Sequence, residues 1–408
     1  MVNDAHGRRA VFIIHQPPVP PLPSVDNLTH SLVGLAAAKA GLERQSPYAA
    51  FVCVAAANLP DVDIVALAGG PAFYLKHHRG ITHSIVGTLA LAVALALLFC
   101  AAERAWARAR GREPRARLKG LLVCSLLLAA SHPLLDWTNS YGVRPLLPWD
   151  GRWIYGDLLF VIDPWVWLVL GGACFLLAES RARAAGWCLL ALVATLLFFR
   201  VVLQSNAGFP NGPGVPPVAL VLWCAGLAAS ALLRWKGVGA RPGRVVAGSA
   251  LLFCVFYCFV LALMHTYART EAQLAASSLA YRTNERVLRV AATPVLADPF
   301  TWRCLSENER STSRFDMGLF HSRPEELRSV ARYERPAGED EGLVRRASEG
   351  EAARVLLDFA RFPVASVRRS ERAGWVVQFA DLRFTEPGAG ARAGGFALDV
   401  PVGTPAGR

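Results

Sequence analysis

The feature that most constrains this chain is a series of apolar stretches, each close to the roughly 20 residues that a helix needs to cross a bilayer. Two shorter apolar stretches, 28–42 and 47–59, come first, and we expect them to form a helical hairpin packed against the longer helices. The six long stretches are 85–102, 118–135, 158–177, 186–203, 217–233 and 245–264. The pattern predicts an all-α polytopic membrane domain of six long and two short helices, over residues 25–266.

The positive charge of the chain is distributed in alternate loops. The net charge is +12 although 53% of the residues are hydrophobic, a combination that suggests a nucleic-acid-binding protein until the arginines are located. They concentrate in three short loops, around 104–119, 181–183 and 234–244. By the positive-inside rule these loops are cytoplasmic, so 132–163, 204–216 and everything after 265 face the outside. The surplus charge therefore sets the orientation, and we expect no direct nucleic-acid partner.

The composition changes after the last apolar stretch. Residues 267–408 are rich in Arg, Glu and Asp and contain short alternating runs such as 374–379 and 396–400, which are typical of strands. We expect a helical connector near 267–288, then a small mixed or mainly β domain outside the membrane, with a loose charged insertion around 323–351. At the other end, the Pro-rich residues 1–24 predict a disordered or extraneous extension, with a natural start at Val25.

Histidines mark three helix ends. Residues 29–34 and 82–87 form a near repeat, Thr-His-Ser-aliphatic-Val-Gly, and each opens an apolar helix, so that His30 and His83 begin their helices on the same side. His132 lies near the outer end of the second long stretch. All three side chains are therefore expected at one level of the membrane.

Carboxylates accompany these histidines. Asp61 and Asp63 follow the second short helix, and Asp136 lies four residues after His132 on the same helical face. Imidazole and carboxylate together are ligands for zinc, manganese or iron, and ionisable groups at membrane depth are costly enough to suggest a function. One histidine or aspartate alone often only caps a helix. Because six such residues coincide, we predict a site for one or two divalent ions, most consistent with zinc.

Two further residues are candidates for acid–base catalysis. His78 lies in the motif Lys-His-His-Arg at 76–79, whose charges alternatively serve only to bind lipid headgroups. Asp157 belongs to the predicted external loop 137–163, which also contains Asn139, Tyr141 and Arg144 as groups that could orient an anionic or carbonyl substrate.

These motifs together resemble the YdjM-like inner-membrane proteins, a family described as metal-dependent hydrolases and also named for LexA binding. The matching segments are 26–34, 57–63, 78–84 and 132–136, continuing through 155–157. The resemblance covers roughly residues 25–170 and supplies no substrate. It implies metal-site positions at His30, Asp61, Asp63, His83, His132 and Asp136.

The residues and the resemblance together predict a multi-pass inner-membrane hydrolase in which a metal-activated water attacks a phosphoryl or carbonyl group. The depth of the site suggests a lipid or lipid-linked substrate at the outer face. Two other interpretations are a transporter or metal-binding carrier and a membrane scaffold that recruits a partner. A carrier is expected to distribute polar groups through the bilayer, whereas here they gather at one face.

Overall fold

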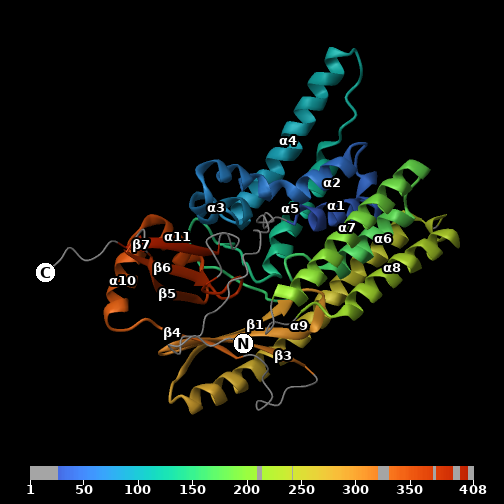
Figure 1. Ribbon diagram of the computed structural model, residues 1–408. Coiled ribbons are helices and arrows are strands. Elements are labelled where there is room, and N and C mark those ends of the chain that lie inside the picture. Colours follow the sequence, from blue (N-terminus) through green and yellow to red (C-terminus); the bar gives the residue numbers. More distant parts are fainter. Residues whose placement is uncertain are drawn as a thin grey trace.

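The structure is a computed structural model in which a bundle of helices is followed by two small β-sheets (Figure 1). The N-terminal extension expected at 1–24 lies outside the residues that the structure describes. Those residues are 26–208, 214–240, 242–319, 330–370, 374–388 and 396–402.

The first helical group packs through small side chains. Its core contains Ala56, Ala57, Ala92, Ala96 and Ala129, all fully buried, so the helices approach closely. Its elements are α1 (Asn27–Lys39), η1 (Leu42–Arg44), α2 (Ala49–Asn58), η2 (Leu59–Gly69), α3 (Pro71–His77), η3 (Ile81–His83), α4 (Ile85–Ala109) and α5 (Leu118–Trp137).

The two glycines of the near repeat explain part of that closeness. A Cβ at Gly34 would lie 2.9 Å from the Cys53 carbonyl oxygen of α2. A Cβ at Gly87 would lie only 1.8 Å from the carbonyl oxygen of Ile81. Each glycine therefore lets a histidine-bearing helix end touch neighbouring backbone.

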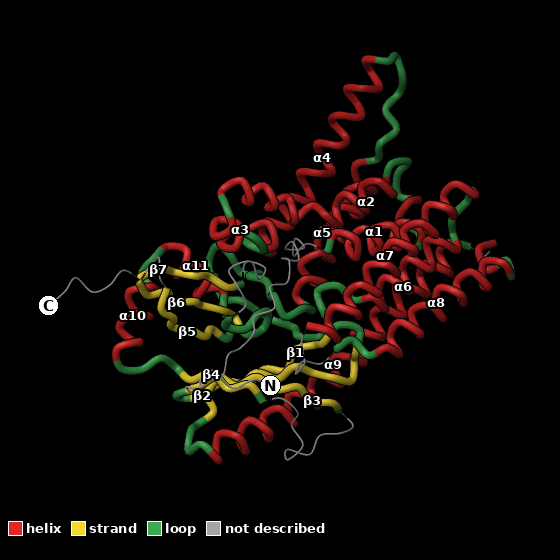
Figure 2. Tube along the Cα trace, in the orientation of Figure 1, coloured by secondary structure: helices red, strands yellow, loops and turns green. Residues whose placement is uncertain are grey.

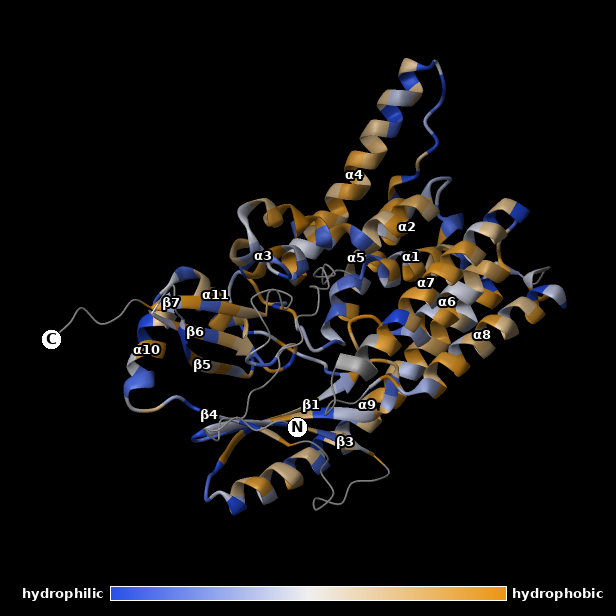
Figure 3. Cartoon of the chain, viewed as in Figure 1, coloured by the Kyte–Doolittle hydropathy of each residue, from blue (hydrophilic) through white to orange (hydrophobic). Residues whose placement is uncertain are grey.

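The second helical group is strongly apolar, as the colouring of Figure 3 shows along α6, α7 and α8. It consists of α6 (Pro164–Leu176), α7 (Arg181–Gly208), α8 (Pro217–Trp235), η4 (Val238–Ala240) and α9 (Gly243–Arg282). Arg234 at the end of α8 donates to the carbonyl oxygens of Phe175, Leu176 and Ala178 at the end of α6. The basic end of α8 therefore lies against the end of α6.

Within the described residues, six helices are long and apolar enough to cross a membrane, which confirms the membrane class of the fold. They are Ala49–Gly69, Ile85–Ala109, Leu118–Trp137, Arg181–Leu203, Pro217–Trp235 and Gly243–Arg282. Their identity differs in one place from the prediction. The stretch 158–177 contains only the 13-residue helix α6, because Asp163 caps its start ahead of Pro164. Conversely, the short stretch 47–59 is prolonged by η2.

The β region follows α9 and confirms a small, mainly β C-terminal region (Figure 2). Both sheets are antiparallel, with strand orders β1-β2-β3-β4 and β5-β6-β7. The strands are β1 (Val287–Val295), β2 (Asp298–Asn308), β3 (Ser311–Gly318), β4 (Ala331–Glu334), β5 (Pro363–Ser370), β6 (Gly374–Asp381) and β7 (Ala397–Val402). The loose insertion expected at 323–351 is wrong over its described part, which contains β4 and the helix α10 (Glu339–Ser348). The helix α11 (Glu351–Phe359) follows, and both helices are amphipathic with buried apolar faces.

The β region is packed onto the membrane helices at two places. The first sheet packs on α9, where Ala268, Ala272 and Ala276 meet Trp302 and Phe315 in one buried cluster. The second sheet and α11 share a cluster with Leu75 of α3 and Tyr141 of the α5–α6 loop. The connector predicted after the last span is thus the continuation of α9, a single 40-residue helix.

Candidate metal centre

The side chains predicted as metal ligands, together with the acid–base candidate His78, come from five segments of the first helical group. His30 lies in the first turn of α1, which the carboxylate of Asp26 caps. The remaining residues are Asp61 and Asp63 in η2, His78 directly after α3, His83 at the end of η3, and His132 and Asp136 in the last turn and a half of α5. All of these side chains are buried.

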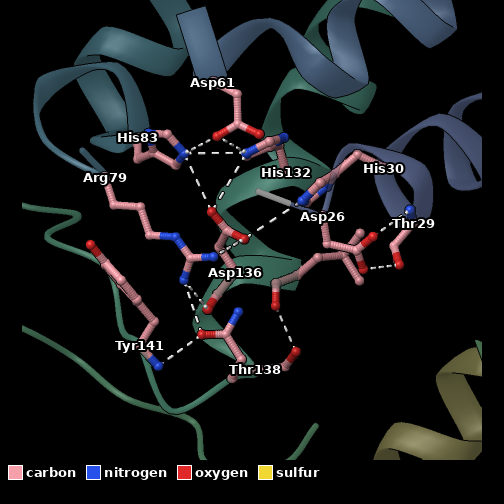
Figure 4. A network of polar contacts seen from close by, with 12 residues as sticks. Asp26, Thr29, His30, Asp61, Arg79, His83, His132, Asp136, Thr138 and Tyr141 are labelled. Carbon is pink, nitrogen blue, oxygen red and sulfur yellow. Dashed lines mark hydrogen bonds and ion pairs between the residues drawn. The ribbon is translucent and has the colours of Figure 1, made fainter. Parts of the chain in front are cut away.

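Four of these residues converge on one point (Figure 4). The Nε2 atom of His83 lies 3.3 Å from Asp61 Oδ1, 3.3 Å from Asp136 Oδ2 and 3.2 Å from Nε2 of His132. The Nε2 atom of His132 lies 3.4 Å from the same Asp61 oxygen and 3.5 Å from the same Asp136 oxygen. We call Asp61, His83, His132 and Asp136 the four-residue cluster.

The imidazoles are held so that their Nε2 atoms point into this cluster. His132 Nδ1 donates to the Ala57 carbonyl oxygen at 2.7 Å, which leaves Nε2 as the acceptor nitrogen of the neutral ring. On His83, Nδ1 lies 3.0 Å from the Thr82 hydroxyl, which in turn donates to Asp63 at 3.1 Å. Metal-binding histidines are oriented in this way by an acceptor on the second ring nitrogen.

A second group shares one residue with the first. Asp61, Asp63 and His78 also lie close enough for a ligand atom of each to bind one ion. Here Asp63 is already well occupied: Oδ1 lies 3.0 Å from His78 Nδ1, and Oδ2 accepts from the Arg79 backbone amide at 2.9 Å. The opposite nitrogen of His78, Nε2, is buried and makes no hydrogen bond.

His30 lies beside the four-residue cluster. Its ring stacks on that of His132 with centroids 3.7 Å apart, and its Nε2 atom is 3.5 Å from Asp136 Oδ1. The structure therefore places all six residues predicted as ligands in one network, with His30 and Asp63 at its periphery. Their assignment as ligands remains a prediction.

Arg79 is a member of this network that the sequence did not single out. Its guanidinium donates to Asp136 Oδ1 at 2.7 Å and to Asn139 Oδ1 at 2.9 Å, while its backbone has a φ of 52°. That conformation is uncommon for a residue with a side chain and indicates that the surroundings impose it. The only sequence signal was the position of Arg79 between His78 and Gly80.

Burial and nearby carboxylates shift histidine pKa values in opposite directions, as His78 and His83, which lie outside the membrane-spanning segments, both show. Burial lowers the pKa of His78 below its usual value in spite of the bond to Asp63. Burial also disfavours charge on His83, but the adjacent carboxylates of Asp136, Asp61 and Asp63 outweigh it and raise the pKa of His83 to about 10. The cluster thus stabilises one positive charge among its acceptors, which a proton or a bound cation can supply.

The external-loop candidates lie at the junction with the β region. Asp157 Oδ2 pairs with Arg361 of the β region at 2.7 Å. The ring of Tyr141 lies under the Arg79 guanidinium, 4.6 Å from it, and packs against Phe359 of α11. Arg144 donates to the Lys76 carbonyl oxygen and stacks on Trp153. Asp157 is absent from both ligand groups, and its proposed acid–base role stays a prediction.

Comparison with known proteins finds a family match over the segment that contains this centre. A family model described as YdjM inner membrane protein matches residues 25–207. The resemblance to the YdjM family is confirmed. The matched segment contains every residue of both ligand groups, and with the six long apolar helices it describes a multi-pass membrane protein with a buried Asp/His site that could bind a metal.

One curated relative extends this picture only slightly. The uncharacterised protein YfhP of Bacillus subtilis (strain 168) is 28% identical over 116 residues, which is 28% of this chain and 32% of YfhP. The chain therefore spans about a third of the length of that relative. No solved structure matches the chain.

Proposed function

We propose that this protein is a membrane-bound, metal-dependent hydrolase acting on a phosphoryl or carbonyl group of a lipid or lipid-linked substrate. The observation that carries the proposal is the convergence of two imidazole nitrogens and two carboxylate oxygens, all buried and within 4.8 Å of one another. Two oriented histidines and two carboxylates suit zinc, with manganese or iron as other metals that accept this donor set.

The donor set fits a cation because one of its own carboxylate oxygens lacks a hydrogen-bond donor. Asp136 Oδ2 is buried and no donor meets it in good hydrogen-bond geometry, although the Nε2 atoms of His83 and His132 lie 3.3 and 3.5 Å away. A buried acceptor without a donor is costly, and a cation would satisfy it. The chemistry that such an ion supplies when bound is Lewis-acid activation of water and of the scissile group.

The surrounding residues orient the ligands and accept a proton. Arg79 holds Asp136 by one oxygen and leaves the other directed at His83 and His132. His78 is neutral at physiological pH because burial lowers its pKa, and Asp63 on Nδ1 orients its ring. We assign His78 the role of proton acceptor. A second ion held by Asp61, Asp63 and His78 is the alternative, and it predicts two ions per chain in place of one.

Metal analysis of detergent-purified protein tests this proposal. We expect about one ion per wild-type chain and near-complete loss in a His83→Ala, His132→Ala double variant. The matched control is His77→Ala, which removes an exposed histidine of the neighbouring helix and should retain the metal. Equal metal content in wild type and double variant would refute the site.

Activity is tested separately with phospholipid, polyprenyl-phosphate and ester substrates. Hydrolysis of one class by wild type, lost in the double variant, is the expected result. Metal binding without hydrolysis, together with metal uptake into protein-containing vesicles, would instead identify a carrier.

We also propose that the metal centre and the β region face the outside of the inner membrane. The basic end of α8 lies against the end of α6, whereas the other end of α6 lies beside the start of α1, where Trp167 donates to Thr29. A cysteine at Arg152, whose side chain is 84% exposed, should react with an impermeant reagent in intact cells, whereas one at Arg112 should not. The reverse pattern would invert the orientation.

A further inference from the structure

An apolar cavity of about 340 Å³ lies between α1, α6, α7 and α8. Leu28 and Leu32 of α1 form one wall, and Trp167 and Gly171 of α6 form another. The third side is built by residues near the middle of α7 and α8, including Trp187 and Leu227. Its volume falls at the small end of the range of about 300–1,000 Å³ that is typical of ligand sites.

Four polar side chains of the wall are already bonded. The Thr195 hydroxyl donates to the Ala191 carbonyl oxygen at 2.7 Å and accepts from Trp223 Nε1 at 2.8 Å. The Ser230 hydroxyl donates to Gly226, and Trp167 Nε1 donates to the Thr29 hydroxyl. A cavity whose wall is almost entirely apolar does not hold water and favours a hydrocarbon occupant.

The cavity is adjacent to the metal centre through α1. His30 faces the four-residue cluster, whereas Leu28 and Leu32, two positions away on either side, face the cavity. From Trp167 to Phe175 the α6 wall covers nine residues, or a length of about 12 Å along a helix. The cavity thus runs from the level of the metal centre toward the basic end of the bundle.

The α7 wall is open to the bilayer. Leu190 and Leu192 line the cavity and are nevertheless 36% and 55% exposed, on a helix apolar enough to span the membrane. A hydrocarbon chain can therefore enter sideways from the surrounding lipid without crossing a polar surface. The narrow volume suits one chain and excludes a whole diacyl lipid.

We propose, building on the hydrolase function above, that one fatty acyl chain of a membrane phospholipid occupies this cavity while its glycerol and headgroup lie at the metal centre. The shared α1 wall then aligns the two parts of the substrate. The apolar wall of the cavity selects the class of substrate, and the metal centre selects the bond that is attacked.

Filling the cavity tests the proposal. A Cβ at Gly171 meets no atom within 4 Å, so Gly171→Leu places its side chain in the cavity without a backbone clash. Ala231→Leu fills it from α8 and covers the case in which the first variant does not fold. The matched control is Gly248→Leu, a half-buried helical glycine of α9 that also has open space at Cβ and lies outside the cavity lining.

The probe is a phosphatidylcholine carrying a photoactivatable diazirine in one acyl chain, in nanodiscs with the full chain. We expect crosslinks concentrated in 167–175, 187–195 and 223–231, at least fivefold weaker in Gly171→Leu or Ala231→Leu and unchanged in Gly248→Leu. Uniform labelling of all apolar helices, insensitivity to both filling variants, preferential labelling by a diazirine polyprenyl phosphate, or a crosslinked second copy at this face would each overturn the proposal.

The metal-free variant separates this proposal from the hydrolase function. His83→Ala, His132→Ala should still label in the cavity, because the wall is intact. Cavity labelling without any hydrolysis by wild type would leave the acyl site standing and remove the hydrolase function. Hydrolysis of phospholipid that is unaffected by both filling variants would do the opposite.

Discussion

The metal centre and the Arg383–Asp381 pair of the β region both bury charge, but they differ in how completely that charge is partnered. In the β region, each guanidinium nitrogen of Arg383 donates: to Asp381, to the Ser140 carbonyl oxygen and to that of Phe359. Asp381 also accepts from the backbone amides of Arg361 and Arg383. In the metal centre, buried atoms of His30, His78, Arg79 and Asp136 make no hydrogen bond.

This difference distinguishes a structural pair from a binding site. A buried ion pair whose hydrogen bonds are all made serves only the structure of the folded chain. No donor or acceptor is left in it to bind a further ligand. Several unsatisfied buried groups gathered at one place, as a carboxylate oxygen and ring nitrogens are here, indicate a position where a further ligand compensates for them. The comparison therefore predicts that neutralising Asp381 affects stability, whereas changes around Asp136 affect metal binding.

The largest effect is expected at Asp381. Asp381→Asn removes the charge opposite Arg383, whose buried guanidinium then lacks compensation, and should destabilise the β region by about 3–5 kcal/mol. Denaturant unfolding of the purified protein measures it. Arg368→Gln, which removes an exposed partner of Asp399, serves as the control and should cost less than about 1 kcal/mol. A similar small loss at both positions would remove the distinction between the two regions.

At the metal centre, Arg79→Lys is expected to weaken metal binding by about tenfold to a hundredfold with little change in stability. Lysine keeps the charge but cannot donate to Asp136 and Asn139 at once, so Asp136 loses its orientation. Competition with a chelator at fixed pH measures the affinity. Unchanged affinity with reduced stability would place Arg79 with the structural pair.

Much of this centre could be predicted from the sequence because helix geometry carries the information. His132 and Asp136 share a helical face, and the near repeat around His30 and His83 places both at helix starts. The class of the fold followed similarly from the lengths of the apolar stretches.

Other parts depended on contacts between distant segments. Arg79 acquires its role from a backbone turn and from Asn139, 60 residues away. The acyl-sized cavity arises where four helices fail to fill the space between them, and periodicity carries no signal for such a space. The helices α10 and α11 were missed because their high charge masked amphipathic faces that pack on the second sheet.

A smaller effect concerns protons. The pKa of His83, raised to about 10 without metal, means that the ring is protonated at neutral pH and that metal binding must displace this proton. Apparent metal affinity should rise about tenfold per pH unit between about 7 and 10 and level off above. In the metal-free protein the same proton stabilises the fold below the ordinary pKa of 6.5, and that contribution is lost as pH rises through 10.

Calorimetry in two buffers of different ionisation enthalpy checks this, with about one proton released per ion at pH 8. Absence of proton release would mean that His83 is already neutral in the metal-free protein. The difference in buried charge between the metal centre and the β region would then disappear.

Asp157 falls between the two regions and gives the finest test. One carboxylate oxygen pairs with Arg361, whereas the other is buried and makes no hydrogen bond. Arg361→Lys keeps the charge but shortens the reach and weakens the stacking on Tyr155, so we expect a loss of about 1 kcal/mol in unfolding free energy and unchanged metal content.

Asp157→Asn then decides which region Asp157 resembles. Because its strongest contact joins the external loop to the β region, we expect reduced stability in the same direction as Arg361→Lys, with hydrolysis falling only as far as folded protein is lost. If Asp157→Asn instead keeps its stability and abolishes hydrolysis, the free oxygen is the functional one. Asp157 would then act as an acid–base group, and a single carboxylate would serve both the docking of the β region and the chemistry of the metal centre.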